Sequence, residues 1–251
     1  FLTLTPTYLV MSLTLGLNTA ISGLLVSQRS LDLISHNIAN VNTEGFSRKT
    51  VNAESRVLAG HGAGVQISSV SRTVDDNLRK DLRTETSNWS MSDTMSNYYE
   101  RIQDLFGRPG DNTTYSHLIA AFGQSLESLA ATPDNTSVQW GAVSAAEDLT
   151  LNLNSMTSQL QTLRLNADKE IANAVTVINS KLSDVLTLND TIVREQAVGH
   201  EIGDLEDQRD VALAKVSEYI DIHTFLRDDN TVVVYTGGGR TLLDSATVSM
   251  S

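Results

Sequence analysis

The histidines are the residues best suited to metal binding or acid–base chemistry, but their spacing forms no site. His200 is followed by Glu201, as in a helical zinc motif, yet Asp204 occupies the position where that motif needs a second histidine. Zinc sites require several ligands that the fold brings together. We therefore expect all five to be surface or packing residues: His36, His61, His117, His200 and His223.

Two glycine-rich stretches have the composition of phosphate-binding loops. Gly60, Gly62 and Gly64 lack a following Lys-Ser/Thr pair and precede a strand pattern, and the run 237–239 has no helix pattern behind it. Both stretches are predicted to be turns.

One acidic segment could hold paired carboxylates. Glu206, Asp207 and Asp210 surround Arg209 in a pattern typical of a helix. Residues three or four apart share a helix face, so solvated charges or a local ion pair are expected there. The chain also has no cysteine, which excludes a cysteine nucleophile and a disulfide framework. The sequence predicts neither an enzyme nor a cofactor.

The composition narrows the class of protein further. The chain has 251 residues and a net charge of −12, enough for one or two domains. Such an acidic balance argues against binding to nucleic acid, because phosphate binding needs a clustered basic surface. It argues against binding to anionic membrane surfaces for the same reason. The longest uncharged stretch, 1–28, is too rich in Ser, Thr, Asn and Gly for a membrane-spanning helix, so no membrane insertion is expected.

The start of the chain carries no recognisable export signal. Residues 1–10 are apolar but have neither a basic region nor a small-residue cleavage site. Met11 resembles a natural start, so residues 1–11 are predicted to be an extension or a start-site artefact.

A helix is predicted from about residue 13 to residue 39. Its apolar seam repeats at alternating spacings of four and three, as in a coiled coil. The rest of the helix surface carries Ser, Thr and Asn with little charge, which leaves two interpretations. The helix packs within its own domain, or other subunits bury it on several sides, where uncharged polar groups cost less to desolvate. The seam consists of Leu17, Ile21, Leu24, Gln28, Leu31, Ile34 and Ile38.

A turn follows this helix, and the remaining sequence alternates between helical and strand patterns. Asn40, Asn42 and Gly45 tolerate left-handed backbone and predict the turn. Residues 47–74 are expected to be strand-like or irregular, with a short strand around Val65 and Ile67. Further helices are predicted over about 74–107, 116–131, 137–197 and 202–219, and a β-hairpin that turns at 228–230 follows from 221.

These patterns predict a mainly α fold. Long antiparallel helices should form a bundle or coiled-coil rod, in which the second and fourth helices pair, and a small β element should begin near the C-terminal end. The expected domains are 12–73 (terminal helix, turn and extended segment), 74–220 (long-helix bundle) and 221–251 (hairpin at the start of a truncated outer domain).

The segment from Ser35 to Arg48 resembles the N-terminal signature of bacterial flagellar axial proteins, N-N-I-A-N-x-N-T-x-G-[YF]. Two mild departures are His36, where Asn is commoner, and Phe46, which stands in place of Tyr. The resemblance marks the following residues as the assembly motif: Asn37, Ile38, Ala39, Asn40, Asn42, Thr43, Gly45 and Phe46.

The rest of the chain is similar to the hook-associated branch of these proteins. Leu205–Asp210 resembles its L-x-D-Q-R-D segment, and residues 62–75, 122–134 and 188–192 match other parts of it. That branch continues beyond the hairpin into another long helix, so the chain looks like an N-terminal portion or a truncated product. The alternative is another axial protein, a hook or distal rod subunit.

The resemblance implies a structural subunit that joins the hook to the filament of the bacterial flagellum. Its implied partners are copies of itself in a helical ring, the hook protein, a second hook–filament junction protein and an export chaperone. It also implies export through the flagellar type III apparatus without signal cleavage, and therefore an extracellular location in the flagellum.

Overall fold

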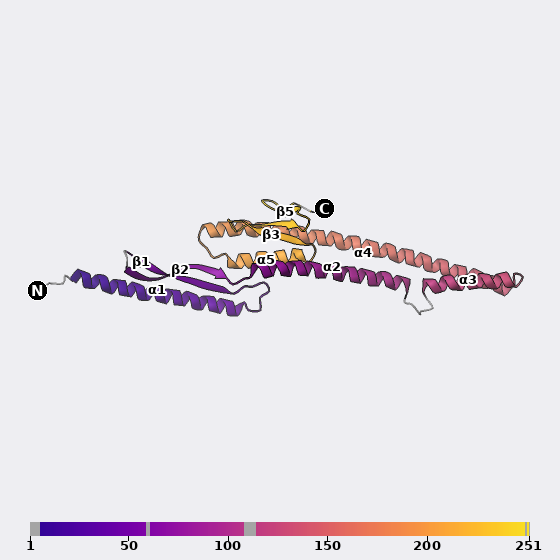
Figure 1. Ribbon diagram of the computed structural model, residues 1–251, viewed down its shortest axis with the longest axis horizontal. Helices are drawn as coiled ribbons and strands as arrows, with labels where there is room; N and C mark the ends of the chain where they lie inside the picture. The colour runs from indigo at the N-terminus through magenta and orange to yellow at the C-terminus, as the bar shows by residue number, and fades with distance from the viewer. Residues whose placement is uncertain (1–5, 59–60, 108–113, 249, 251) are drawn as a thin grey trace. The chain divides into compact units, whose positions relative to one another are not determined.

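The structure, a computed structural model, describes residues 6–58, 61–107, 114–248 and 250, without the side chains of 6–12, 58 and 61. Most of these residues are helical, as predicted (Figure 1). The predicted extension, 1–11, lies outside the described side chains. In chain order the elements are α1 (Pro6–Ala39), β1 (Lys49–Leu58), β2 (His61–Arg72), α2 (Asp76–Phe106), α3 (Tyr115–Ala131), α4 (Thr136–Ala197), α5 (Gly203–Ser217), β3 (Ile222–Leu226), β4 (Val232–Thr236) and β5 (Thr241–Leu243).

The chain divides into two compact units. The first comprises residues 1–85 and 178–250, and the second comprises residues 86–177. Both α2 and α4 contribute residues to each unit. The domain boundaries predicted from the sequence follow the kind of secondary structure, whereas the compact units follow contacts, so the two divisions differ.

The core of the first unit lies between α4, α5 and the C-terminal sheet. Ile178, Leu182 and Val185 of α4 are at most 3% exposed and contact Leu213 and Val216 of α5. These α4 positions follow the three–four spacing that the sequence shows, which places them on one helix face. Burying each such side chain contributes about 1.5–3 kcal/mol, so this cluster anchors the unit.

The C-terminal sheet is antiparallel and has the order β3-β4-β5. The predicted hairpin is confirmed: β3 pairs with β4, and Asn230 in the connecting turn has a φ of 67°. Asparagine tolerates this left-handed conformation better than most residues. A third strand, β5, pairs with β4 and adds Leu242 and Leu243 to the core.

An antiparallel hairpin of β1 and β2 lies along α1 (Figure 1). The sequence predicted only one short strand here, because two irregularities in the register and the many polar residues obscure the alternation. The hairpin approaches α1 closely at Gly64, which has a φ of 105° and would place a Cβ 2.1 Å from Oγ of Ser22. That same hydroxyl accepts a hydrogen bond from the backbone N–H of Val65 at 3.1 Å.

The second unit is built from the later part of α2, from α3 and from the first part of α4. Oη of Tyr98 in α2 donates to Oε2 of Glu170 in α4 at 2.7 Å, and Tyr115 in α3 donates to the backbone oxygen of Asn152. Further along α2, Leu105 lines the same surface hollow as Gln159 and Leu163 of α4, so α2 runs antiparallel to α4. A side-chain contact therefore joins α2 and α4 in this unit, but none of the described α2 side chains is buried, so apolar packing between the two helices stays a prediction.

Candidate functional site

The turn after α1 is built by its own side chains and backbone. Nδ2 of Asn40 donates to the backbone oxygen of His36 at 3.0 Å, and Oγ1 of Thr43 donates to Oδ1 of Asn40 at 3.2 Å. The backbone N–H of Thr43 donates to the oxygen of Asn40 at 2.9 Å. Short polar side chains that bond locally in this way stabilise turns in place of further helix, so α1 ends here.

Asn37 joins the last turn of α1 to the start of β1. Its Nδ2 donates to the backbone oxygen of Lys49 at 2.8 Å, and its Oδ1 accepts from the backbone N–H of the same residue at 3.0 Å. The amide thus satisfies both backbone groups of one strand residue. An amide suits this role because it carries a donor and an acceptor on separate atoms of one side chain.

Phe46 packs beside this connection rather than into a core. Its ring meets the ring of His36 edge-on at a centroid distance of 5.5 Å, and Nζ of Lys49 lies 4.1 Å from its centroid. An ammonium at that distance over an aromatic face is attracted by the ring. Three other residues of the predicted motif are exposed and face solvent: Ile38, Ala39 and Asn42.

Gly45 lies against α5. Its φ is 75°, and an added Cβ would stand 2.1 Å from Cγ2 of Val211. Glycine is therefore required twice, by the left-handed backbone and by the close approach of the turn to the helix. Sequence reasoning identified the first requirement only, because nothing in the sequence indicates that α5 lies beneath the turn.

The open end of the β1–β2 hairpin carries two cations that face one carboxylate. Lys49 and Arg72 are paired across the hairpin, where two like charges would repel. Asp207 of α5 lies within reach of both: Oδ2 is 3.0 Å from Nζ of Lys49, and Oδ1 is 2.9 Å from Nη1 of Arg72. Both the N–H and the hydroxyl of Ser47 also donate to this carboxylate. Asp207 therefore links the hairpin, the turn and α5.

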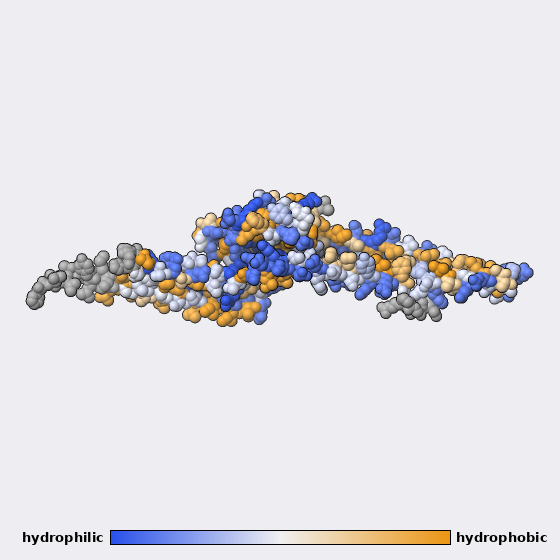
Figure 2. All heavy atoms as spheres, in the orientation of Figure 1, coloured by the Kyte–Doolittle hydropathy of each residue, from blue (hydrophilic) through white to orange (hydrophobic). Residues whose placement is uncertain are grey.

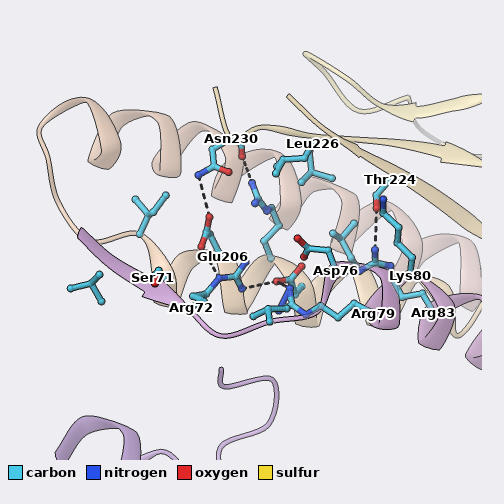
Figure 3. A pocket seen from close by; sticks show the side chains of 18 residues that line it. Ser71, Arg72, Asp76, Arg79, Lys80, Arg83, Glu206, Thr224, Leu226 and Asn230 are labelled. Atoms are coloured by element: carbon cyan, nitrogen blue, oxygen red, sulfur yellow. Dashed lines mark hydrogen bonds and ion pairs between the residues drawn. The ribbon is translucent and has the colours of Figure 1, made fainter. Parts of the chain in front are cut away.

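Arg72 extends this network to the beginning of α2. Its Nε lies 2.7 Å from Oε2 of Glu206, and its Nη1 lies 2.8 Å from Oδ2 of Asp210, which also pairs with Arg79 (Figure 3). The expectation of solvated charges or a local ion pair in this part of α5 is wrong. The pairing is long-range and largely buried, because the helix presents its acidic face to the hairpin and to α2.

Hydrogen bonding outweighs desolvation in setting the charge states of Asp207 and Arg72. Burial by itself would raise the pKa of Asp207, but hydrogen bonds from Ser47, Arg72 and Lys49 lower it below the ordinary value. Burial by itself would lower the pKa of Arg72, but hydrogen bonds to Asp210 and Asp207 raise it. Both groups are therefore held in their charged forms.

The predicted seam of α1 lies on the exposed side of the helix. The side that packs on the hairpin instead carries Ser22, Val26, Ser30, Leu33 and Asn37, and of the described α1 side chains only that of Leu33 is buried. Apolar residues are visible at the surface over the C-terminal end of α1 (Figure 2). The apolar seam residues are 44–68% exposed: Leu17, Ile21, Leu24, Leu31, Ile34 and Ile38.

The site's chemistry is one of contact and positioning. Among the described residues, no group of three or more His, Cys, Asp or Glu side chains could hold a metal ion. Glu206, Asp207 and Asp210 are occupied by arginine and lysine partners. Polar residues and buried ion pairs hold the α1 helix and the hairpin against another helix, an arrangement that is expected of a structural subunit.

Comparison with known proteins agrees with this class. The sequence profile described as "Flagellar hook-associated protein FlgK helical domain" matches residues 99–250, so the chain belongs to that family of flagellar proteins. The profile of the flagella basal body rod protein matches residues 17–46, which contain the seam and the whole assembly motif. The matches support the hook-associated branch rather than a hook or distal rod subunit.

Individual relatives cover most of the chain. Flagellar hook-associated protein 1 of Salmonella typhimurium is 27% identical over 92% of the chain, and that of Bacillus subtilis is 26% identical over 83%. The chain spans 43% of the length of each of these relatives. The flagellar hook junction protein FlgK from Burkholderia pseudomallei is similar in structure, with a TM-score of 0.56, 25% identity and coverage of 68% of this chain and 29% of that one.

Proposed function

We propose that this protein is a structural subunit of the hook–filament junction and that the exposed seam of α1 is its main assembly surface. The observation that carries the proposal is the orientation of α1. Its small and polar side contacts the hairpin, whereas its regular apolar seam is uncovered. An apolar stripe at alternating three and four spacing is the pattern by which helices pack side by side.

The energetics favour an assembly role for the seam. Each leucine or isoleucine that moves from solvent to a packed interface contributes about 1.5–3 kcal/mol. Single exposed apolar side chains are normal on a protein surface, but six of them in one stripe on one helix indicate an interaction site. The other interpretation of the helix, that it packs only within its own unit, does not explain why this stripe is apolar.

The turn of residues 40–46 sets the direction in which α1 leaves the rest of the unit. Gly45 rests on Val211, and Asn37 holds β1, so the helix cannot tilt without breaking these contacts. In this proposal the assembly motif acts by fixing geometry: Asn37, Asn40, Thr43, Gly45 and Phe46 position the helix, and Ile38 belongs to the surface that other subunits contact. Ala39 and Asn42 are exposed and available to neighbouring subunits.

The proposed partners are copies of the same chain, the hook protein and a second hook–filament junction protein, with an export chaperone before assembly. Family membership and the names of the relatives support this list. The proposed location is the extracellular part of the flagellum, reached through the flagellar export apparatus without signal cleavage. Among the described residues, no helix has the length and apolar content needed to cross a membrane. The role requires neither catalysis nor a cofactor.

The test is to place a charge in the seam without disturbing the fold. Leu24→Asp at the chromosomal locus that encodes the chain changes a side chain that is 68% exposed, so the folded chain should lose little stability. A buried carboxylate in a helix–helix interface is costly, so assembly should fail. Asn18→Asp adds the same charge to the same helix away from the seam and serves as the control.

We expect the Leu24→Asp strain to lose swimming in soft agar and to shed filament subunits into the medium. The Asn18→Asp strain should swim at the parental rate. Thermal unfolding of the purified chains should differ by no more than about 2 °C, which corresponds to a typical surface substitution. Normal filaments and parental swimming in the Leu24→Asp strain would refute the role of the seam.

A further inference from the structure

A cavity of about 460 Å³ lies in the first unit between the end of β2, the start of α2, the helix α5 and the β3–β4 hairpin. Its volume is within the range of small-ligand sites. Figure 3 shows side chains from α2, α5 and the C-terminal sheet converging around it. The cations that line it are Arg72, Arg79, Lys80, Arg83 and Arg209.

The carboxylates that line the cavity do not balance these cations. The lining contains five cationic side chains but three carboxylates: Asp76, Glu206 and Asp210. Glu206 and Asp210 are already paired with Arg72 and Arg79. Excess positive charge is unexpected in a chain whose net charge is −12, so it calls for a physical reason.

Two arginines in the cavity have no carboxylate partner among the described residues. Arg83 donates to Oγ1 of Thr224 at 3.0 Å, as Figure 3 shows. Arg209 is 3% exposed and donates from Nη1 to Oδ1 of Asn189 at 3.0 Å and to the backbone oxygen of Asn230. Within the described part of the chain, the buried Nε of Arg209 has no hydrogen-bond partner.

Arg209 is therefore a buried cation and Arg83 a half-buried one, and neutral groups hold both. Burial lowers the pKa of Arg83 and of Arg209, despite the nearby carboxylates. A buried charge without a counter-ion is costly, and a bound anion would remove much of that cost. The apolar residues Val74, Leu213 and Leu226 in the lining reduce the local polarity and so strengthen such an interaction.

We infer that this cavity binds an oxyanion, a carboxylate or phosphate group, through Arg83 and Arg209. The planar guanidinium presents paired N–H donors that match the oxygens of both groups. The anion can be a free ion or the acidic side chain of a neighbouring copy of the chain. The second source rests on the proposed assembly function, and the first does not.

The first experiment uses inorganic phosphate as the probe. The purified chain is heated at pH 7 in increasing phosphate, with chloride added to keep the ionic strength constant, and helix content is followed by circular dichroism. Phosphate stabilises many proteins without a specific site, so variants are essential. Arg83→Gln removes the charge and keeps a donor near Thr224, Arg83→Lys keeps the charge, and Arg164→Gln makes the same charge change outside the cavity lining.

A saturable rise in melting temperature of roughly 3–6 °C is expected at ten times the dissociation constant, in the wild type and in Arg164→Gln. Arg83→Gln should lose this rise, and Arg83→Lys should keep part of it. If Arg83→Gln fails to fold, Arg83→Lys replaces it in the test, and a weaker phosphate response in Arg83→Lys than in the wild type supports the inference. Equal phosphate responses in the wild type and in the folded Arg83 variants would overturn the inference.

The second experiment distinguishes the sources by sedimentation velocity over a range of protein concentrations. If a neighbouring copy supplies the carboxylate, both saturating phosphate and Arg83→Lys should weaken self-association at least fivefold. If the ion is free, phosphate binds and self-association does not change. Failure of the seam variants to affect swimming would refute the assembly function but would leave the phosphate result standing.

Discussion

Replacing Asp207 by asparagine tests whether the buried ion pairs hold the hairpin and the turn against α5. The Asp207 side chain is 8% exposed. It accepts hydrogen bonds from the N–H and the hydroxyl of Ser47, from Nζ of Lys49 and from Nη1 of Arg72. Asparagine has nearly the same volume, so the change removes the charge and one acceptor while the packing is kept.

The expected loss of stability is large because a buried cation, Lys49, and a largely buried one, Arg72, lose their shared partner. Removing one member of a buried ion pair typically costs about 3–5 kcal/mol. Lys49 is 4% exposed and Arg72 is 14% exposed, so water cannot replace the carboxylate fully. The two cations also face each other across the hairpin, where like charges are unfavourable. We therefore expect Asp207→Asn to destabilise the first unit by about 3–5 kcal/mol.

Asp204→Asn provides a matched control on the same helix. Asp204 also pairs with Nζ of Lys49, at 2.5 Å, but its side chain is 60% exposed. Exposed pairs contribute only about 0–1 kcal/mol, because water and salt screen them. The same substitution three residues earlier should therefore have a small effect.

Hydrogen exchange measured by mass spectrometry is the suitable assay. Trp89 and Trp140 both lie in the second unit, so tryptophan fluorescence would not report directly on the first. Peptides that cover residues 45–74 should exchange at least about 100-fold faster in Asp207→Asn than in the wild type. If Asp207→Asn has no greater effect than Asp204→Asn, the network does not hold the hairpin and the reasoning is wrong.

The effect should also depend on pH in a defined direction. Burial by itself would raise the pKa of Asp207, but the hydrogen bonds from Ser47 and Arg72 lower it in the folded state. A carboxyl group with a lowered folded pKa contributes its stability above the unfolded pKa, about 3.9, and loses it as the pH falls through the folded value. The difference between the wild type and Asp207→Asn should be complete at pH 7 and should shrink below about pH 4.

Three further predictions concern α1 and its turn. The Gly45→Val protein should be exported and soluble but should abolish motility, because its Cβ overlaps Val211 and its backbone is strained. Adding Val211→Ala should restore part of the swimming. Parental swimming of the Gly45→Val strain alone would contradict the role of the turn. Asn37→Ala should destabilise the first unit by about 1–3 kcal/mol in urea unfolding, since it leaves two backbone groups of β1 unpaired, whereas exposed Asn42→Ala should change little. Residues 12–40 should exchange hydrogen rapidly in the isolated monomer, because only one described α1 side chain is buried, and strong protection in a proven monomer would refute this.

The sequence by itself determined the helices, the C-terminal hairpin and the kind of protein, but not the β1–β2 hairpin or β5. The three–four spacing of Ile178, Leu182 and Val185 predicted both a helix and the face that is buried, because burial follows helical periodicity directly. The break at 228–230 predicted the hairpin, since turn residues act locally. The segment from Ser35 to Arg48 indicated the flagellar axial family before any fold was known.

The tertiary structure decided which surfaces meet. The seam of α1 is readable from its spacing, but only the fold shows that Ser22 and Leu33 face the hairpin and that the seam is uncovered. Asp207 looks like one of several solvated acids until the fold brings Ser47 and Arg72 to it. Those partners are 160 and 135 residues away, and a helix period cannot encode a contact over such separations, because only packing of the whole unit sets it.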